Sequence, residues 1–238
     1  QDALTQVGLW GDGRLSALSS YENRVYLAHL ERPEQGHDAV VLKFYRPGRW
    51  REDQILEEHA FAHELAEAEV PMVAPLVLNG SSLHTHGDFF FSVSPRRGGR
   101  LPELDDLDVL EWIGRLMARL HDVGARQPFV QRPALNLNSF GTEPLEWPLR
   151  HDAVTPGQRG EWEQVCRDML ARIAAHPALC AGAGDPDGIA HIRTHGDCHP
   201  GNILWTPGEG EGAGPHFVDL DDARTAPAVQ DLWMLAQG

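Results

Sequence analysis

Cysteine is scarce in this sequence, and long hydrophobic runs are absent. The three cysteines, Cys166, Cys180 and Cys198, form no C-x-x-C pair and no metal-finger spacing. An odd and low cysteine count is typical of a reducing compartment, so we expect a cytoplasmic protein. No stretch of about 18 consecutive apolar residues occurs, which excludes a membrane-spanning helix.

Basic residues are also few relative to acidic ones. The chain has 20 Lys and Arg against 35 Asp and Glu, which gives a net charge of −15. Such a chain repels polyanions, so neither nucleic acid nor an anionic membrane is expected as a partner. Hydrophobic residues make up 42% of the 238 residues, which suits one large domain or two small ones that share a cleft.

The first hundred residues predict a small sheet with one helix. Strand-like runs cover residues 15–18, 24–30, 39–45, 70–78 and 89–93. Apolar positions at helical spacing, from Ile55 to Leu65, predict a helix over residues 51–69. Gly8, Gly11 and Gly13 indicate a turn before the first strand.

After residue 100 the composition shifts toward helix. A helix with one apolar face (Leu110, Ile113, Met117 and Leu120) is expected to stop before Gly124. Further predictions are an irregular connection over 126–160, a helix over 161–175, a loop over 177–188, a strand over 189–194 and a hairpin that pairs 203–205 with 216–218. The chain begins without Met and stops inside an apolar helical run, so we expect it to be C-terminally incomplete.

Two acidic segments carry the strongest chemical signal. The run His195–Asn202, HGDCHPGN, places the carboxylate of Asp197 near the amide of Asn202, and Asp219 follows an apolar strand in FVDLDD. Phosphoryl transfer needs a carboxylate to accept the proton of the attacking hydroxyl, and oxygen ligands for Mg²⁺. The alternative is a hydrolase metal site built from the two histidines, Asp197 and Cys198, but it leaves Asp219 without a role.

Lys43 is an isolated cation in the apolar strand VVLKFY. A buried ammonium without a partner is unfavourable, so a functional partner is one interpretation. A strand-edge lysine that extends its ammonium to solvent is the other.

Together these segments resemble a known family. HGDCHPGN followed by FVDLDD is similar to the catalytic and metal-binding motifs of the aminoglycoside phosphotransferase-like kinases, relatives of the eukaryotic protein kinases. With SYENRVY, VLKFYRPGRW and QDLWML, the pattern resembles the stress response kinase A family of bacterial serine/threonine kinases, over Ser20 to Leu235. The resemblance implies an α+β, two-lobed protein kinase-like fold. Its parts would be an N-terminal lobe (1–95) with an antiparallel sheet and one helix, a hinge (96–100), and a larger, mainly helical C-terminal lobe (101–238).

The resemblance also implies residue roles. Asp197 would be the catalytic base, Asn202 and Asp219 would bind Mg²⁺, Asp219 would bridge metal and ATP phosphates, and Lys43 would bind phosphate. The partner of Lys43 would be a carboxylate of the first helix. Glu57 and Glu58 compete, and we choose Glu58 from its spacing to Phe61 and Leu65.

Several neighbouring positions keep two interpretations. Ser20, in a turn that replaces the glycine-rich loop of protein kinases, either approaches ATP or belongs to an ordinary hairpin turn. Asp231 either bonds the catalytic loop or is a plain charge at a helix start. Asp221 and Asp222 either attract a basic substrate or form a solvated turn. Adenine is expected near residues 93–96, and Phe89 and Phe91 are expected in the core.

We therefore expect an ATP- and Mg²⁺-dependent serine/threonine protein kinase of stress response. It would be a monomer that acts on a protein, with the kinase itself as one candidate acceptor. The alternative acceptor is a small molecule such as an aminoglycoside, choline or homoserine. A catalytically silent nucleotide-binding protein is disfavoured because Lys43, Asp197, Asn202 and Asp219 are all present.

Overall fold

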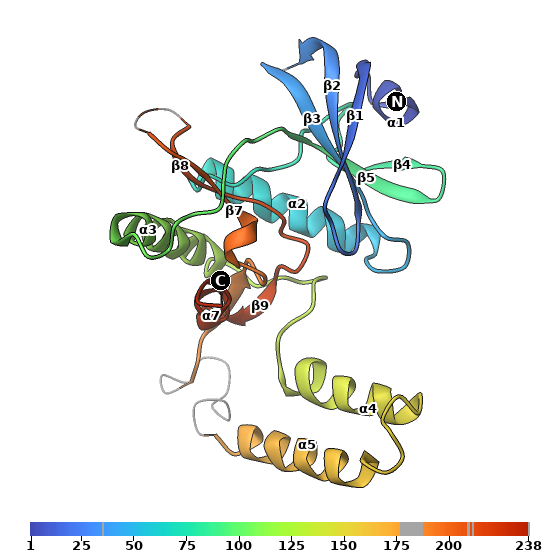
Figure 1. Ribbon diagram of the computed structural model, residues 1–238, viewed down its shortest axis with the longest axis vertical. Helices are drawn as coiled ribbons and strands as arrows, with labels where there is room; N and C mark the ends of the chain where they lie inside the picture. The colour runs from blue at the N-terminus through green and yellow to red at the C-terminus, as the bar shows by residue number, and fades with distance from the viewer. Residues whose placement is uncertain (35, 177–187, 209, 211, 238) are drawn as a thin grey trace.

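The computed structural model describes residues 1–34, 36–176, 188–208, 210 and 212–237 (Figure 1). The loop predicted over 177–188 therefore lies almost wholly outside the described residues. None of the helices in the described part of the chain has the length and hydropathy that crossing a bilayer requires.

The N-terminal part is a five-stranded antiparallel sheet with one long helix, as predicted. The sheet has the order β1-β2-β3-β5-β4. Its elements are α1 (Asp2–Gln6), β1 (Gly11–Leu18), β2 (Arg24–Glu34), β3 (His37–Phe44), α2 (Glu52–Glu67), β4 (His84–His86) and β5 (Phe89–Pro95). The short helix α1 was not predicted, and it packs on one face of the sheet with Leu42, Phe91 and Val93.

Residues 70–78 are not the strand that the sequence predicted. Only isolated bridges occur, from Met72 to Phe217 and from Leu78 to Ser81. Pro71 and Pro75 lack the backbone N–H that a continuous ladder needs, which explains the irregular course. The first strand also starts earlier than predicted, at Gly11, with a register shift before Leu15.

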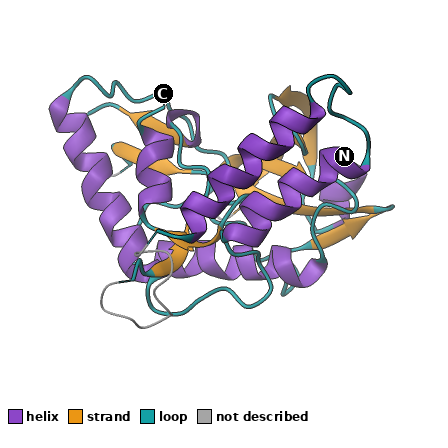
Figure 2. Cartoon of the chain, turned by 90° about the horizontal axis from the view of Figure 1, so that it is seen from below, coloured by secondary structure: helices purple, strands orange, loops and turns teal. Residues whose placement is uncertain are grey.

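The C-terminal part combines helices with two small sheets. Its elements are α3 (Leu107–Gly124), a π-helical turn (Asn138–Thr142), α4 (Glu143–Arg150), α5 (Arg159–Ala174), β6 (His191–Thr194), a 3₁₀ turn (Pro200–Asn202), β7 (Ile203–Thr206), β8 (Gly214–Phe217), β9 (Arg224–Pro227) and α7 (Val229–Leu235). Strand β6 pairs with β9, and β7 pairs with β8. The N terminus lies beside the large sheet, and the C terminus lies beside the small strands (Figures 1 and 2).

Two helix predictions need correction. The buried face of α3 contains Val109 rather than Leu110. The helix also includes Gly124, where an added Cβ would lie 2.1 Å from the carbonyl oxygen of Arg193, so this glycine allows close packing and does not end the helix. The stretch 126–160 is not wholly irregular, since it contains α4 and the start of α5. Proline in the first turn of α4 is compatible with a helix, so its presence was a misleading signal. The domain boundaries at residues 95 and 100 stay a prediction.

Candidate active site

The loop after β6 is anchored by Asp231, in the first turn of α7. Its Oδ2 accepts a hydrogen bond from the backbone N–H of His195 (3.0 Å), and its Oδ1 accepts one from that of Gly196 (2.9 Å). The ring Nε2 of His121 lies 2.9 Å from Oδ2. Burial raises the pKa of the Asp231 carboxyl, but these hydrogen bonds outweigh burial and hold the pKa below its usual value. Asp231 therefore fixes the loop backbone, beyond any effect as a helix-terminal charge.

Gly196 lets this loop pass directly against the segment after β8. Its φ is +84°, and a Cβ at this position would lie 2.0 Å from the carbonyl oxygen of Asp222. The ring of His195 is fully buried, and its Nε2 lies 2.9 Å from the carbonyl oxygen of Val218. Both contacts join the two acidic segments that the sequence singled out.

Asp197 and Asn202 lie side by side. The Asn202 amide nitrogen donates to the backbone oxygen of Asp197 (2.9 Å) and to its Oδ2 (3.3 Å). Burial raises the pKa of the Asp197 carboxyl, and the nearby His199 opposes that rise, with its Nε2 3.6 Å from Oδ2. The side chain of Asp197 is still 32% exposed. It is therefore a partly desolvated carboxylate that a substrate can reach.

The structure does not bring together the metal site that the hydrolase alternative requires. The ring Nε2 of His195 is engaged by a backbone carbonyl, and Cys198 is fully buried, which raises the pKa of its thiol well above the usual value. Within the described ranges, no group of three or more His, Cys, Asp or Glu side chains is arranged to hold a metal ion.

Asp219 follows β8 with an unusual backbone conformation. Its φ is +63°, which is rare for a residue other than glycine and is frequent at functional positions. Its Oδ1 lies 2.8 Å from Nζ of Lys43, and this cation lowers the pKa of the Asp219 carboxyl. The side chain is 48% exposed, so the carboxylate faces both Lys43 and open space.

Lys43 points away from the core that α1 covers. Side chains alternate along β3, and its neighbour Leu42 belongs to that core, so Lys43 lies on the opposite face. Besides Asp219, its Nζ lies 3.1 Å from Asp221 and 3.9 Å from Glu58. Burial lowers the pKa of the ammonium, but the carboxylates outweigh this effect and raise it. Lys43 is thus a paired cation and not one that extends to solvent.

Of the two competing glutamates, Glu58 is the one that lies near Lys43. It is buried on α2, which raises the pKa of its carboxyl to about 7, and Lys43 and Arg132 act in the opposite direction. Glu57 instead accepts hydrogen bonds from backbone N–H groups of residues 130–132. Sequence reasoning missed Arg132, because it lies in an irregular stretch without a motif.

Ser20 is bound within its own turn. Its hydroxyl oxygen accepts a hydrogen bond from the backbone N–H of Asn23 at 3.3 Å. No hydrogen bond among the described residues joins it to Lys43 or Asp219. A role in ATP binding stays a prediction.

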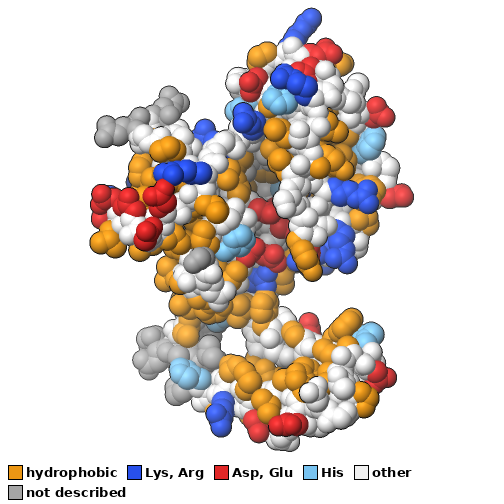
Figure 3. Space-filling model, viewed as in Figure 1, with side chains coloured by type: hydrophobic (Ala, Val, Ile, Leu, Met, Phe, Trp, Pro, Cys, Tyr) orange, Lys and Arg blue, Asp and Glu red, His pale blue; other side chains and the backbone are white. Residues whose placement is uncertain are grey.

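The predicted hinge, residues 96–100, follows β5 of the large sheet and forms hydrogen bonds with β7. Backbone groups of Arg100 and Trp205 exchange two hydrogen bonds of 2.9 and 2.7 Å. A hollow of about 510 Å³ lies beside these residues and is lined by residues 97–100 and 205–207. It contains none of the predicted catalytic residues. Acidic side chains gather instead in the hollow between the two parts of the molecule (Figure 3).

Asp221 and Asp222 both lie beside cations. Asp221 pairs with Lys43, and Oδ1 of Asp222 lies 3.3 Å from Arg49 and 2.7 Å from Arg224. Neither residue is therefore a freely solvated acid.

Comparison with known proteins identifies the family of the chain. The model of the phosphotransferase enzyme family (APH) matches residues 14–237. Stress response kinase A of Escherichia coli K12 is 43% identical over 239 residues, with 100% of this chain and 67% of that protein covered. The serine/threonine protein kinase RdoA of Salmonella typhimurium LT2 is 42% identical with the same coverage. The chain thus spans about two thirds of the length of these relatives.

Solved structures show the same fold. An amicoumacin kinase in complex with AMP-PNP and Ca²⁺ superposes with a TM-score of 0.73 at 18% identity, over 99% of this chain and 67% of that one. A microcompartment-associated aminopropanol kinase superposes with a TM-score of 0.71 at 18% identity, over 99% and 73%. The predicted kinase-like α+β fold is therefore confirmed. The chain belongs to the phosphotransferase enzyme family and, within it, to the stress response kinase A family of kinases.

Proposed function

We propose that this kinase binds MgATP in the cleft beside the ion pair of Lys43 and Asp219 and phosphorylates serine or threonine hydroxyls of a protein. The ion pair of these two residues supports the proposal most, because a cation that can bind phosphate lies beside a carboxylate that can bind Mg²⁺. The neighbouring pair of Asp197 and Asn202 supports it. All four residue types match the needs of phosphoryl transfer.

In this proposal Asp197 accepts the proton of the attacking hydroxyl. Burial raises the pKa of its carboxyl, and a higher pKa makes a carboxylate a better base as long as it stays ionised at neutral pH. The Asn202 amide fixes the Asp197 side chain from one side. Asp197 is thus oriented before substrate arrives, and its exposed face can meet an acceptor.

The residues present fit a Mg²⁺ ion. The amide nitrogen of Asn202 is used by Asp197, so its oxygen is the atom left for a cation, and Asp219 supplies a half-exposed carboxylate. Mg²⁺ favours few protein ligands together with phosphate and water oxygens. A Mg²⁺ ion bound there would neutralise the charge of the ATP phosphates.

A protein acceptor is favoured over a cationic small molecule by the state of the acidic residues. Asp221 and Asp222 already pair with Lys43, Arg49 and Arg224, so neither is left free to pair with an amine. We also propose a cytoplasmic location, because the free thiols of Cys166 and Cys198 suit a reducing compartment.

The test is a transfer assay with labelled ATP, with the full-length protein as enzyme. The acceptors are a generic protein substrate, the enzyme itself, and a panel of aminoglycosides and amino alcohols. Mass spectrometry is expected to find phosphoserine or phosphothreonine that depends on Mg²⁺. Transfer to small molecules alone would overturn the assignment of the acceptor.

A further inference from the structure

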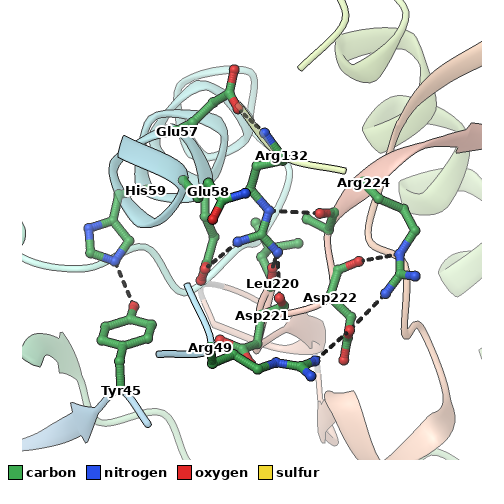
Figure 4. Close-up of polar contacts among 12 residues, drawn as sticks. Tyr45, Arg49, Glu57, Glu58, His59, Arg132, Leu220, Asp221, Asp222 and Arg224 are labelled. Atoms are coloured by element: carbon green, nitrogen blue, oxygen red, sulfur yellow. Dashed lines mark hydrogen bonds and ion pairs between the residues drawn. The ribbon is translucent and has the colours of Figure 1, made fainter. Parts of the chain in front are cut away.

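Arg132 is the most heavily engaged cation among the described residues outside the predicted catalytic set. Its side chain has no exposed surface. Its Nε donates to the carbonyl oxygen of Ala223 at 2.8 Å, and its Nη2 donates to the carbonyl oxygens of Asp221 and Leu220. Its Nη1 donates to Oε2 of Glu58 at 3.3 Å (Figure 4). One guanidinium thus contacts both α2 and the segment that follows Asp219.

The backbone around Arg132 is itself bound to α2. The Glu57 carboxylate accepts N–H donors from Val130, Gln131 and Arg132 at 2.6 to 2.8 Å. Gln54, one turn earlier on α2, donates its side-chain amide to the Gln131 carbonyl oxygen at 2.9 Å. These hydrogen bonds fix the backbone of Arg132 relative to α2, so its side chain can reach few alternative positions.

The two carboxylate oxygens of Glu58 are divided between two cations. Oε2 faces Arg132, and Oε1 faces Lys43 at 3.9 Å. A buried carboxylate with two such partners has its orientation determined by both of them. If Arg132 is removed, Glu58 keeps only the longer contact. The carbonyl oxygens of Asp221 and Ala223 lose the guanidinium as donor, and that of Leu220 keeps only the backbone N–H of Ala223.

We propose that Arg132 is a positioning residue for phosphoryl transfer, which sets the orientation of Glu58 toward Lys43 and the path of the backbone after Asp219. This inference rests on the proposed function of the Lys43–Asp219 cleft. Arg132 does not contact the reacting groups. It acts by joining the two elements that present them, and the contact of its guanidinium with the ring of Trp50, at 4.3 Å, keeps it in place.

Arg193 provides a matched control within the same molecule. It is also a buried arginine that pairs with a glutamate of α2 (Glu64, 2.7 Å), donates to a backbone carbonyl and covers an aromatic ring, that of Phe61. Its backbone pairs with Thr225 of β9, but among the described residues its side chain contacts neither Glu58 nor residues 220–223, which Arg132 contacts. If Arg132 served stability alone, its replacement should affect stability and kcat in the same way as replacement of Arg193.

The experiment compares Arg132→Gln, Arg132→Lys and Arg193→Gln in the full-length protein, each assayed at a temperature at which circular dichroism shows it folded. Both Gln variants are expected to lower the thermal midpoint. Only Arg132→Gln is expected to lower kcat, on the order of 10²-fold, since small displacements of catalytic groups have effects of this size. Its KM for ATP should change much less. Arg132→Lys should recover part of the loss, as should added guanidinium with the Gln variant.

A double-mutant cycle with Glu58→Gln completes the test. If Arg132 acts through Glu58, the two losses in kcat are far from additive, because the second change removes an interaction that is already lost. Additive losses, or equal kcat for the Arg132→Gln and Arg193→Gln proteins, would overturn the inference. A wild-type protein that neither binds MgATP nor transfers phosphate would instead overturn the proposed function, so the two failures are distinguishable.

Discussion

Nζ of Lys43 lies 2.8 Å from Oδ1 of Asp219, although 176 positions separate the two residues in the sequence. The ion pair joins a strand of the N-terminal sheet to the segment after β8. Asp219 adopts a positive φ at this point, a conformation that costs about 1–3 kcal/mol and persists only where surrounding contacts impose it. The geometry of the cleft is therefore set by contacts between distant parts of the chain.

The Asp197→Asn variant tests the proposal that Asp197 is the catalytic base. Loss of general-base catalysis should lower the transfer rate by about 10²–10⁴-fold. The change is isosteric and leaves Lys43 and Asp219 untouched, so affinity for MgATP should stay close to that of the wild type. Transfer kinetics and calorimetric titration with nucleotide give the two quantities. A wild-type rate in this variant would remove Asp197 from the mechanism.

The Asp219→Asn variant tests the metal ligand. Nucleotide affinity is measured with and without Mg²⁺ for the wild type and the variant. Wild-type affinity should rise with Mg²⁺, and the variant should lose most of that rise because a neutral amide binds Mg²⁺ more weakly than a carboxylate. An unchanged response to Mg²⁺ in the variant would show that Asp219 is not a ligand.

Asp231 should contribute to stability far more than a helix-terminal charge does. Asp231→Ala leaves two buried backbone N–H groups without an acceptor, so the free energy of unfolding should fall by roughly 2–5 kcal/mol. The control is Asp108→Ala, an exposed acid in the first turn of α3, which should cost about 1 kcal/mol or less. Urea denaturation measures both. Equal effects would return Asp231 to the role of a plain helix charge.

His59 should make stability depend on pH. Burial lowers its pKa from 6.5 to about 3 in the folded protein, and its ring bonds Tyr45 and Ser82. Between these pH values the unfolded chain binds a proton at His59 that the folded protein does not, so the contribution of His59 to stability should fall as pH drops below 6.5, by up to about 1.4 kcal/mol per unit. The raised pKa of Glu58 acts in the opposite direction between pH 7 and 4.5, so the His59 contribution is the difference between the wild type and a His59 variant. Above pH 6.5 both states are neutral, and the effect vanishes.

The matching variants separate this titration from other acid effects. His59→Gln should flatten the slope between pH 6.5 and 5, whereas Tyr45→Phe, which keeps the imidazole, should retain it. Chemical denaturation across this range gives the slopes. The same slope in the wild type and in His59→Gln would assign the acid sensitivity to other groups.

Local patterns in the sequence account for much of the fold. The helical spacing from Ile55 to Leu65 predicted α2, because one face of an isolated helix already carries its apolar residues. Residues 70–78 were wrongly predicted as a strand, since apolar content was weighed above the two prolines. Val109 was missed on α3 because the face that a helix buries depends on its neighbours, and periodicity alone defines that face only approximately.

The sequence by itself determined the family, and it singled out the two acidic segments as candidates for the chemistry. Asp197 and Asn202 are five positions apart in one loop, so their proximity follows from short-range geometry. Only the tertiary structure decided that Glu58 rather than Glu57 faces Lys43, and that Arg132 joins α2 to the segment after Asp219. Adjacent residues of a helix point in different directions, and a buried arginine is placed by partners 74 and 89 positions away. Contacts at such separations leave no local pattern in the sequence.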